Sequence, residues 1–530
     1  MNKIIHANDI HFSQGVQPAL FELVVDIPND DVVHAFLEVV EGVKLSQYLP
    51  PVFSTNPHSH DRVMLLRTAL FAFSQGIRST RDIAEKCRTD VRFLFLSNCE
   101  HPSHQAFERM FQLLEKSIDD IFFEISSKIA VDLMDEDLNI QYVDGTKIEA
   151  NANKNSFVYK KRILHNQEKM FVNIQNEIHN LNQDFGWNFH VQNNCSCRDL
   201  FQICQYLMEV MVQEGIEIKY GIGKRKSDFQ RYYDKFLTFA LRKMDYEYWL
   251  NEIGERRSCS KIDHDATMMN TKYDYYNQTG VTRACYNPQI AVSGGIIVNA
   301  DIFQTPGDTT TWAPFMDRFY DHYGYYPKTP VADAGYGGYD NYMFNLKHGI
   351  DLVQKYNYYG KTLDPKFRKK IYNQFNWKQN EEGFKICPAG KVFDCYEEDR
   401  FSRTSGGNLR IQQIWKEKDQ CEGCPMRSEC TKARNGRIVA FDPVLAEFQR
   451  TVDQNLGGEE GKELRRQRSI QVEGAFGVIK QDFKFTRFSR RGMSGVKMEF
   501  LLVCLGYNLK KYYIYWLKQR RNQPVDGKYS

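Results

Sequence analysis

The stretch Leu138–Lys154 reads LNIQYVDGTKIEANANK, and the expected fold is built outward from it. Leu138, Ile140 and Tyr142 alternate with polar residues, which predicts a β-strand with one apolar face. Asp144 has the same parity, so a continuing strand points its carboxylate toward the interior or the mouth of a cleft. A carboxylate there needs a cation, a hydrogen-bond donor or a proton. An acid that only caps a turn at the strand end is the alternative.

Two further acids follow similar patterns, and together the strands and helices indicate an α/β fold. Asn287–Phe303 holds two apolar runs around a Ser-Gly-Gly turn, which predicts a hairpin. A short apolar run predicts a buried strand that ends at Asp333, ahead of a glycine-rich loop where open sheets place ligand groups. Glu473 lies on a predicted helix, seven residues before Lys480 and therefore on the same face.

Charge is distributed unevenly along the 530 residues, whose composition of 42% hydrophobic and 26% charged residues is typical of a globular protein. The formal net charge is only +3, but residues 462–521 carry 15 Lys and Arg against four acids. Residues 1–50 carry two Lys against seven acids. A basic C-terminal block favours a phosphate-binding surface, with a solvated basic face as the alternative. The candidate phosphate contacts are Lys480, Arg466, Arg468, Arg487, Arg490 and Arg491.

A helical pattern covers residues 61–114. Gly76 is the predicted stop of one helix, and Ser79 or Thr80 is the predicted cap of the next. A helix, a glycine-containing turn and a second helix with arginines are compatible with a helix-turn-helix DNA reader. A simple helical bundle explains the pattern equally well. The candidate DNA contacts are Arg78 and Arg81.

The chain has 13 cysteines, an odd number, and its first residues lack the apolar core of a secretory leader. Disulfides are therefore not expected, a cytoplasmic location is, and no apolar run is long enough for a membrane span. CEGCPMRSEC contributes a Cys-x2-Cys pair and a third cysteine, with a fourth upstream, which is compatible with a structural Zn²⁺ site. Free thiols that pack a small β-rich insertion are the alternative. The four residues are Cys387, Cys421, Cys424 and Cys430.

Asp144, Asp333 and Glu473 together suggest a cation site. Carboxylate oxygens suit Mg²⁺ or Mn²⁺, and two such ions would activate a nucleophilic water or 3′-hydroxyl and stabilise the leaving oxygen. Lys480 or a nearby arginine would contact the phosphate beside the scissile bond.

The motifs in their order resemble bacterial insertion-sequence DDE transposases with an InsH-like N-terminal domain and a cysteine-bearing DDE catalytic domain. VDGTKIEANANK carries the first acid, Asp144; VADAGYGGYDN carries the second, Asp333; RRQRSIQVEGAFGVIK carries Glu473 and Lys480. The likeness runs from about residue 50 to 510. Two positions depart from the pattern. Ser469 stands where an arginine is often found four residues before the Glu, with Arg468 one position off, and Asp340 stands where a Glu is expected, a change we expect to be neutral.

The resemblance implies an RNase H-like mixed-sheet core, binding of the inverted-repeat ends of the element, metal-dependent strand cleavage and strand transfer into target DNA. It implies double-stranded DNA as partner, a homodimer or larger assembly on that DNA, and association with the nucleoid.

The expected divisions of the chain are a lead-in segment (1–60), a helical N-terminal DNA-binding domain (61–135), the catalytic core (136–154, 261–354 and 441–510), a helical insertion (155–260), a cysteine-containing insertion (355–440) and a basic tail (511–530). Three alternatives remain: a nuclease of the same fold without strand transfer, a non-catalytic DNA-binding protein derived from a transposase, and a glycosidase, which the basic helix disfavours.

Overall fold

The computed structural model describes residues 3–5, 23–25, 27–50, 59–192, 194–221, 224–271, 281–361 and 364–522. The chain divides into two compact units, of which the first comprises residues 1–146, 287–486 and 494–530 and the second residues 147–286 and 487–493. None of the described helices is both long enough and apolar enough to cross a membrane.

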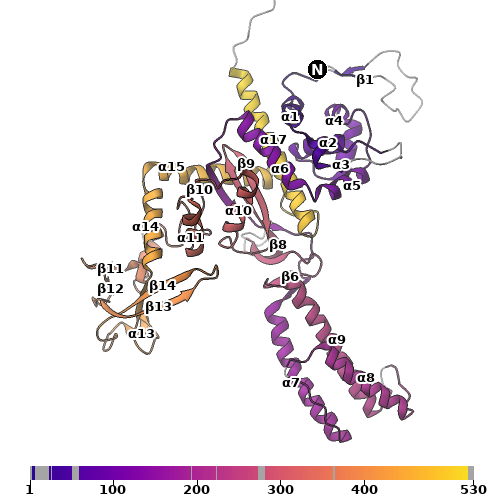
Figure 1. Ribbon diagram of the computed structural model, residues 1–530, viewed down its shortest axis with the longest axis vertical. Coiled ribbons are helices and arrows are strands. Elements are labelled where there is room, and N and C mark those ends of the chain that lie inside the picture. The colour runs from indigo at the N-terminus through magenta and orange to yellow at the C-terminus, as the bar shows by residue number, and fades with distance from the viewer. Residues whose placement is uncertain are drawn as a thin grey trace, which may run out of the picture. The chain divides into compact units, whose positions relative to one another are not determined.

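A mixed sheet forms the centre of the first unit (Figure 1). Its strands are β3 (Ile140–Gly145), β8 (Val281–Ser293), β9 (Ile296–Phe303) and β10 (Thr329–Val331). From Asn287 onward β8 lies between β9 and β3 and is antiparallel to both, whereas β10 is parallel to β3. Beyond β10, Ala332 forms a parallel bridge with Gln354. This arrangement confirms the predicted α/β fold with an RNase H-like mixed sheet.

Helices flank this sheet. α6 (Ile118–Ser127) and α10 (Trp312–Tyr323) pack against β9, and α11 (Tyr339–His348) follows β10. α17 (Met493–Asn522) supplies the fully buried Asn508, whose side-chain amide accepts from the backbone N–H of Ile297 and donates to its carbonyl, both at 2.8 Å. An amide that pairs with both groups satisfies backbone that would otherwise lie unpaired at the strand edge.

The N-terminal part is helical, as predicted. Its helices are α1 (Val32–Glu41), α2 (Arg62–Ser74), α3 (Thr80–Thr89), α4 (Val91–Leu96) and α5 (His104–Leu114). Gly76 turns the chain after α2 with φ +76°, and the Ser79 hydroxyl caps α3 by accepting from the N–H of Asp82. α1 lies within the expected lead-in, yet its Phe36 ring packs edge-to-face on Phe71 at 5.3 Å. The helical part therefore begins earlier than residue 61.

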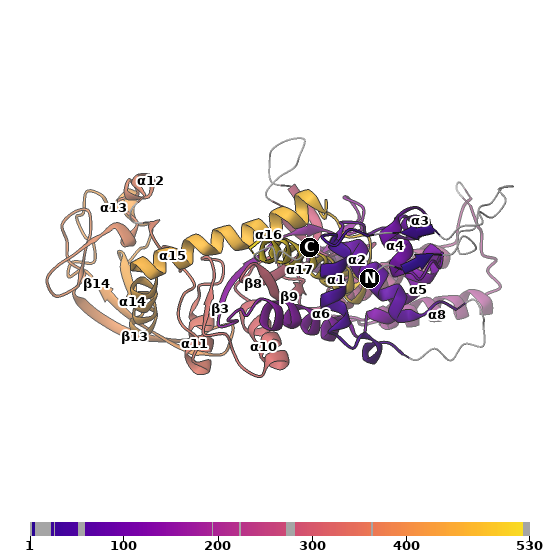
Figure 2. The same ribbon diagram turned by 90° about the horizontal axis from the view of Figure 1, so that it is seen from above.

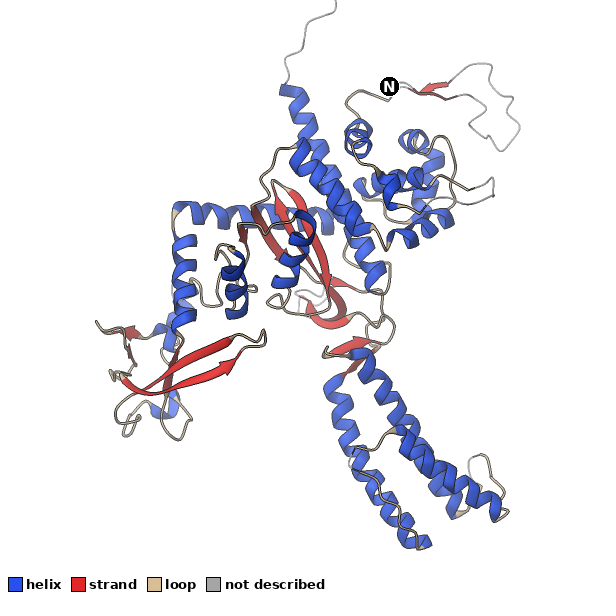
Figure 3. Ribbon diagram, in the orientation of Figure 1, coloured by secondary structure: helices blue, strands red, loops and turns tan. Residues whose placement is uncertain are grey.

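The second unit contains the predicted helical insertion, whose long helices Figure 3 shows in blue. They are α7 (Lys160–Phe185), α8 (Cys197–Gln213) and α9 (Asp228–Ile253). Buried residues from all three, among them Ile174, Leu207 and Phe236, form one apolar core. The unit also contains β4 (Ile148–Glu149), β5 (Phe157–Tyr159), β6 (Ser258–Ser260) and β7 (Thr267–Thr271). The ranges expected for the core include β4 and β7, so the second unit is larger than the insertion expected at 155–260.

The cysteine-containing insertion is β-rich. Its elements are α12 (Pro365–Arg368), η5 (Gln374–Asn376), β11 (Lys378–Gln379), β12 (Lys385–Ile386), β13 (Cys395–Arg403), β14 (Leu409–Lys416), α13 (Arg427–Cys430) and β15 (Ile438–Phe441). β13, β14 and β15 pair in that order as an antiparallel sheet. The shorter elements elsewhere are β1 (Lys3–Ile5), β2 (Leu23–Val25), η2 (Leu45–Tyr48) and η3 (Lys128–Leu133).

The turn between β13 and β14 is held by Asp340 at the start of α11. The Asp340 carboxylate accepts from the Gly406 N–H at 3.0 Å and the Asn408 side-chain amide at 2.8 Å, and also from the Thr404 hydroxyl. Although burial opposes ionisation, these hydrogen bonds together hold the pKa of Asp340 below its ordinary value. The position expected to tolerate Asp in place of Glu therefore anchors the insertion to the helix that follows the second acid.

We expect Asp340→Ala to lower the free energy of unfolding by about 2 kcal/mol, because hydrogen bonds to a charged group contribute roughly 1.5–3 kcal/mol. Urea unfolding measures the loss, and limited proteolysis should find new cleavage at residues 404–408. Glu381→Ala, at an exposed turn of the same insertion, is the control. Equal stability of the two variants would contradict the anchoring role.

The C-terminal part runs as α14 (Pro443–Gly457), α15 (Glu459–Arg468), η6 (Ser469–Glu473), α16 (Gly474–Gly477) and η7 (Val478–Asp482), followed by α17. From Glu459 to Asp482 the chain is one continuous helical rod, along which Figure 2 labels α15 and α16. Within it η6 and η7 are π-helical. The expected basic tail from residue 511 is in fact helical up to Asn522, and its Trp516 donates to Glu38 of α1 at 2.7 Å; residues 523–530 lie outside the described part.

Candidate active site

Asp144 is the second-last residue of β3 and pairs with Ile290 of β8. The N–H of Gly145 donates to its carboxylate at 2.9 Å. A side chain at Gly145 is excluded, because a Cβ there would lie 2.1 Å from the Gln289 side-chain nitrogen. The glycine of the DGT sequence thus lets a buried amide lie directly beside the first acid.

Asp333 lies two residues beyond β10, where the chain turns. The N–H of Gly335 donates to the Asp333 carboxylate at 2.7 Å and closes this turn. Gly337 lies against the backbone of Lys355, 1.9 Å from where a Cβ would stand. The glycine-rich loop is therefore close-packed, and it holds the half-exposed Asp333 at the carboxyl end of the strand.

Arg468, the last residue of α15, joins the two acids. Its Nη2 lies 3.0 Å from Asp144 Oδ2 and 3.7 Å from Asp333 Oδ2. The side chain is only 10% exposed, and its Nε is without a hydrogen-bond partner among the described residues. The sequence predicts Arg468 as a phosphate contact, and in the structure its guanidinium lies between two carboxylates.

The environment of Asp144 opposes its negative charge. Burial raises the pKa of this carboxyl to about 6, Arg468 counteracts the shift, and Asp333 and Asp308 add to it. One guanidinium therefore does not fully compensate the carboxylates, and this is an environment in which an added cation is favourable.

Glu473 ends η6, on the helical rod whose η6 segment packs against β3. A π-helical turn takes five residues, so Arg468 lies one turn before Glu473, although the sequence suggested that the arginine was one position off. Glu473 is exposed. Across the described residues no three His, Cys, Asp or Glu side chains lie close enough together to hold a metal ion. The structure thus brings Asp144 and Asp333 together, and Glu473 approaches them through its helix without joining them.

Lys480, two helical turns beyond Glu473, donates to the Thr146 hydroxyl. Thr146 comes two residues after Asp144, so the lysine ammonium lies beside the strand that carries the first acid. The predicted pairing of Glu473 and Lys480 on one helix is compatible with this position.

The other predicted phosphate contacts differ in whether their guanidinium groups already bind other groups of the protein. Arg78 donates to the Lys484 carbonyl, lies 3.5 Å from Glu499 and covers the Phe485 ring, and burial lowers its pKa. Arg487 donates to the carbonyls of Ala150 and Ala152, and Arg491 to that of Asn151. Arg466 pairs with Glu463 on the surface of α15. Arg490 is half-buried, and Arg81 is exposed on α3.

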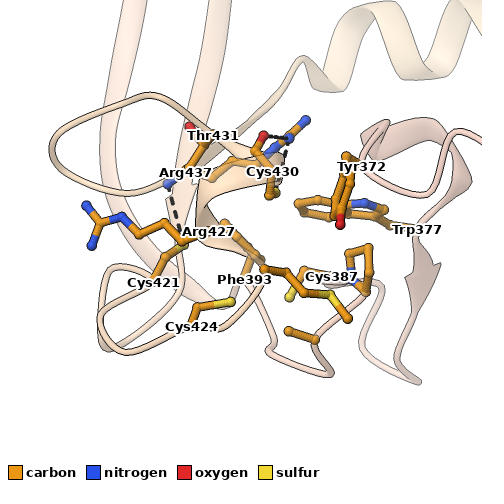
Figure 4. A pocket seen from close by; sticks show the side chains of 13 residues that line it. Tyr372, Trp377, Cys387, Phe393, Cys421, Cys424, Arg427, Cys430, Thr431 and Arg437 are labelled. Atoms are coloured by element: carbon orange, nitrogen blue, oxygen red, sulfur yellow. Dashed lines mark hydrogen bonds between the residues drawn. The ribbon is translucent and has the colours of Figure 1, made fainter.

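Four of the five cysteines of the insertion, Cys387, Cys421, Cys424 and Cys430, line one small cavity together with Trp377 and Phe393 (Figure 4). Cys421 Sγ accepts from the Arg437 N–H at 3.5 Å, and Cys430 Sγ lies 3.4 Å from Arg437 Nη1. Residues from three separate segments thus converge, as a shared ligand would require. In the arrangement of the described residues, however, the thiols are not grouped as a metal site.

Three residues beside the acids were not singled out from the sequence: Gln289, Asp308 and Tyr336. Gln289 is 0% exposed and Tyr336 is 1% exposed, and the Tyr336 hydroxyl donates to the side-chain carbonyl oxygen of Gln289. Gln289 follows a proline in a buried strand, and a fully buried polar residue is the signal that could have identified it.

Two families match parts of the chain. The Transposase DDE domain family matches residues 386–513, which include Glu473, Lys480 and the four cysteines. The Transposase domain (DUF772) family matches residues 21–113, the N-terminal helices. No curated protein and no solved structure matches the chain.

Proposed function

From the two family matches, which identify the chain as an insertion-sequence DDE transposase, we propose that it binds the inverted-repeat ends of its element, cleaves DNA and transfers the strands to target DNA. The proposed catalytic residues are Asp144, Asp333 and Glu473. The observation that carries the proposal is the convergence of Asp144 and Asp333, from separate strands, on the buried Arg468.

The residues fit a divalent cation of the Mg²⁺ or Mn²⁺ type. Asp144 and Asp333 offer hard oxygen ligands, and the pKa of Asp144 is raised by burial first and by the charges of Asp333 and Asp308 second, so a bound cation would stabilise its ionised form. When bound, two such ions would activate a water or 3′-hydroxyl and stabilise the leaving oxygen.

The roles of the chain's own groups follow from their positions. Asp144 and Asp333 would hold the cation, and the exposed Glu473 would complete its ligand set when DNA is bound. Arg468 orients both aspartates, and its unpartnered Nε–H offers a hydrogen bond that a phosphate oxygen would accept. Lys480 contacts the phosphate next to the scissile bond.

DNA ends are held by the N-terminal helices, with Arg81 as an exposed contact on α3, and by the exposed arginines of the C-terminal block. The active species is a homodimer or larger assembly that brings two ends together, and it works at the nucleoid in the cytoplasm. Arg78 and Arg487 support the protein's own packing in this proposal, because their guanidinium groups donate to backbone carbonyls.

The test is an assay with paired element ends, a target plasmid and Mg²⁺. The proposal expects strand cleavage followed by joined products. Cleavage without joining would favour the nuclease alternative, and end binding without cleavage would favour the non-catalytic one. The inverted repeats needed for the assay are found by sequencing the DNA on both sides of the gene.

A structural Zn²⁺ at Cys387, Cys421, Cys424 and Cys430 is the second part of the proposal, supported by the shared cavity. We expect about one equivalent of zinc per chain by elemental analysis, lost in the double variant Cys421→Ser, Cys424→Ser. The double variant Cys195→Ser, Cys204→Ser, in the core of the second unit, is the control. Folded wild-type protein without zinc would rule the site out.

A further inference from the structure

Asp308 lies in the segment between β9 and α10 and is fixed by two buried amides of β8. Its Oδ1 accepts from the Asn287 side chain at 2.8 Å and from the Gln289 side chain at 3.0 Å. Both amides are at most 1% exposed. Two donors from rigid, buried strand positions define where this carboxylate lies.

The Gln289 amide connects Asp308 to the first acid. It occupies the space above Gly145, immediately after Asp144, so tightly that no side chain fits there. It also accepts from the buried Tyr336 hydroxyl, which belongs to the loop after Asp333. One amide therefore contacts the surroundings of both Asp144 and Asp333.

The segment that carries Asp308 also holds the turn of the second acid. The Thr309 hydroxyl donates to the Gly335 carbonyl at 2.8 Å. The Asn341 amide donates to the carbonyls of Thr309 and Tyr336, at 2.9 and 2.7 Å. A Cβ on Gly335 would lie 3.3 Å from Asp308 Oδ2 and 3.0 Å from Asp333 Oδ1, so the two carboxylates flank the same glycine.

Asp308 forms no ion pair with any cationic side chain of the described residues. The nearby guanidinium of Arg468 pairs with Asp144 and Asp333. The two amide donors fix the position of this carboxylate and bring no positive charge to it. An uncompensated carboxylate beside two others strengthens the local potential for a cation.

We propose that Asp308 is a fourth acidic residue of the active site, a positioning residue that orients the Asp333 turn and adds negative charge for the divalent cation. The inference rests on the proposed function, because it concerns the same cation site. It differs from the three-acid assignment in predicting that cation affinity depends on a residue outside the three motifs.

The test uses the full chain and Mn²⁺ alone, in the absence of DNA, with free Mn²⁺ followed by electron paramagnetic resonance. Asp308→Asn keeps the shape of the side chain and removes its charge, and we expect Mn²⁺ affinity to fall about tenfold. Strand cleavage by this variant should recover at raised Mn²⁺ concentration, whereas a variant that was merely damaged would not recover. Asp321→Asn, which removes an exposed charge from α10, should bind Mn²⁺ as the unchanged protein does.

Thr309→Val provides a second measurement, since Thr309 is exposed and its replacement leaves the buried network intact. We expect its Mn²⁺ affinity to fall about threefold through the freed Gly335 turn. If Asp308→Asn does not fold, the Mn²⁺ affinity of Thr309→Val tests the inference in its place. Unchanged affinity in the folded variants would overturn the inference alone, while absence of Mn²⁺ binding by the unchanged protein would overturn the proposed cation site and the inference with it.

Discussion

Asp333→Ala should lower the rate of strand cleavage in Mg²⁺ by at least about 10³-fold while leaving binding of the element ends nearly intact. The carboxylate offers oxygen ligands at the end of β10, and loss of cation-mediated charge stabilisation removes several kcal/mol from the transition state. Binding depends on surfaces elsewhere, so the variant separates recognition from chemistry. Gel-shift titration and a cleavage assay on one labelled end substrate measure the two effects.

The matched control is Asp351→Ala. Asp351 is a half-buried acid that pairs with Lys328 at 3.0 Å near the start of β10, away from the turn that carries Asp333. It should lose some stability and keep its cleavage rate at a temperature where it is folded. Full cleavage by Asp333→Ala with the metal unchanged would discard the catalytic assignment.

Asp144→Asn should stabilise the metal-free protein by roughly 2–3 kcal/mol at pH 7.5. The folded protein raises the pKa of this carboxyl from 3.8 to about 6, mainly through burial. A raised pKa means that the folded state binds the proton more tightly than the unfolded state does. Ionisation of Asp144 therefore lowers stability as pH rises from about 4 to about 6, and the amide removes this penalty.

Urea unfolding in EDTA at several pH values measures the effect. The difference between Asp144→Asn and the unchanged protein should be full above about pH 7 and vanish below about pH 3, where the carboxyl is protonated in both states. The variant should also fail to cleave DNA, because an amide is a poorer cation ligand. A stability difference that does not change with pH would show that ionisation of Asp144 is not its cause.

Strand ends and their acids could be predicted from the sequence, because alternation and a following glycine leave local signals at Asp144 and Asp333. The alternation itself was only partly right. Ile140 is 41% exposed, whereas Gln141 and Val143 are fully buried, since β3 lies inside the sheet and both of its faces are covered. A one-faced pattern does not describe such a strand.

Other parts of the site left no local signal. The contact of Arg468 with the two aspartates joins segments that lie far apart in the chain, which residue spacing alone does not reveal. Asp308 lies in a loop and acquires its role through amides 19 and 21 residues away. All nine residues of β13 are exposed, so that strand carries no apolar periodicity, and its anchor at Asp340 is more than 60 residues distant in the chain.

The π-helical segment Ser469–Glu473 also has a consequence for how such chains are recognised by a sequence motif. Arg468 and Glu473 are five positions apart, and the π-helical segment between them takes more residues per turn than an α-helix does, which changes the direction of the side chains that follow. A motif that requires arginine four residues before the glutamate does not match this chain, whereas a motif that also allows five residues matches Arg468 and Glu473.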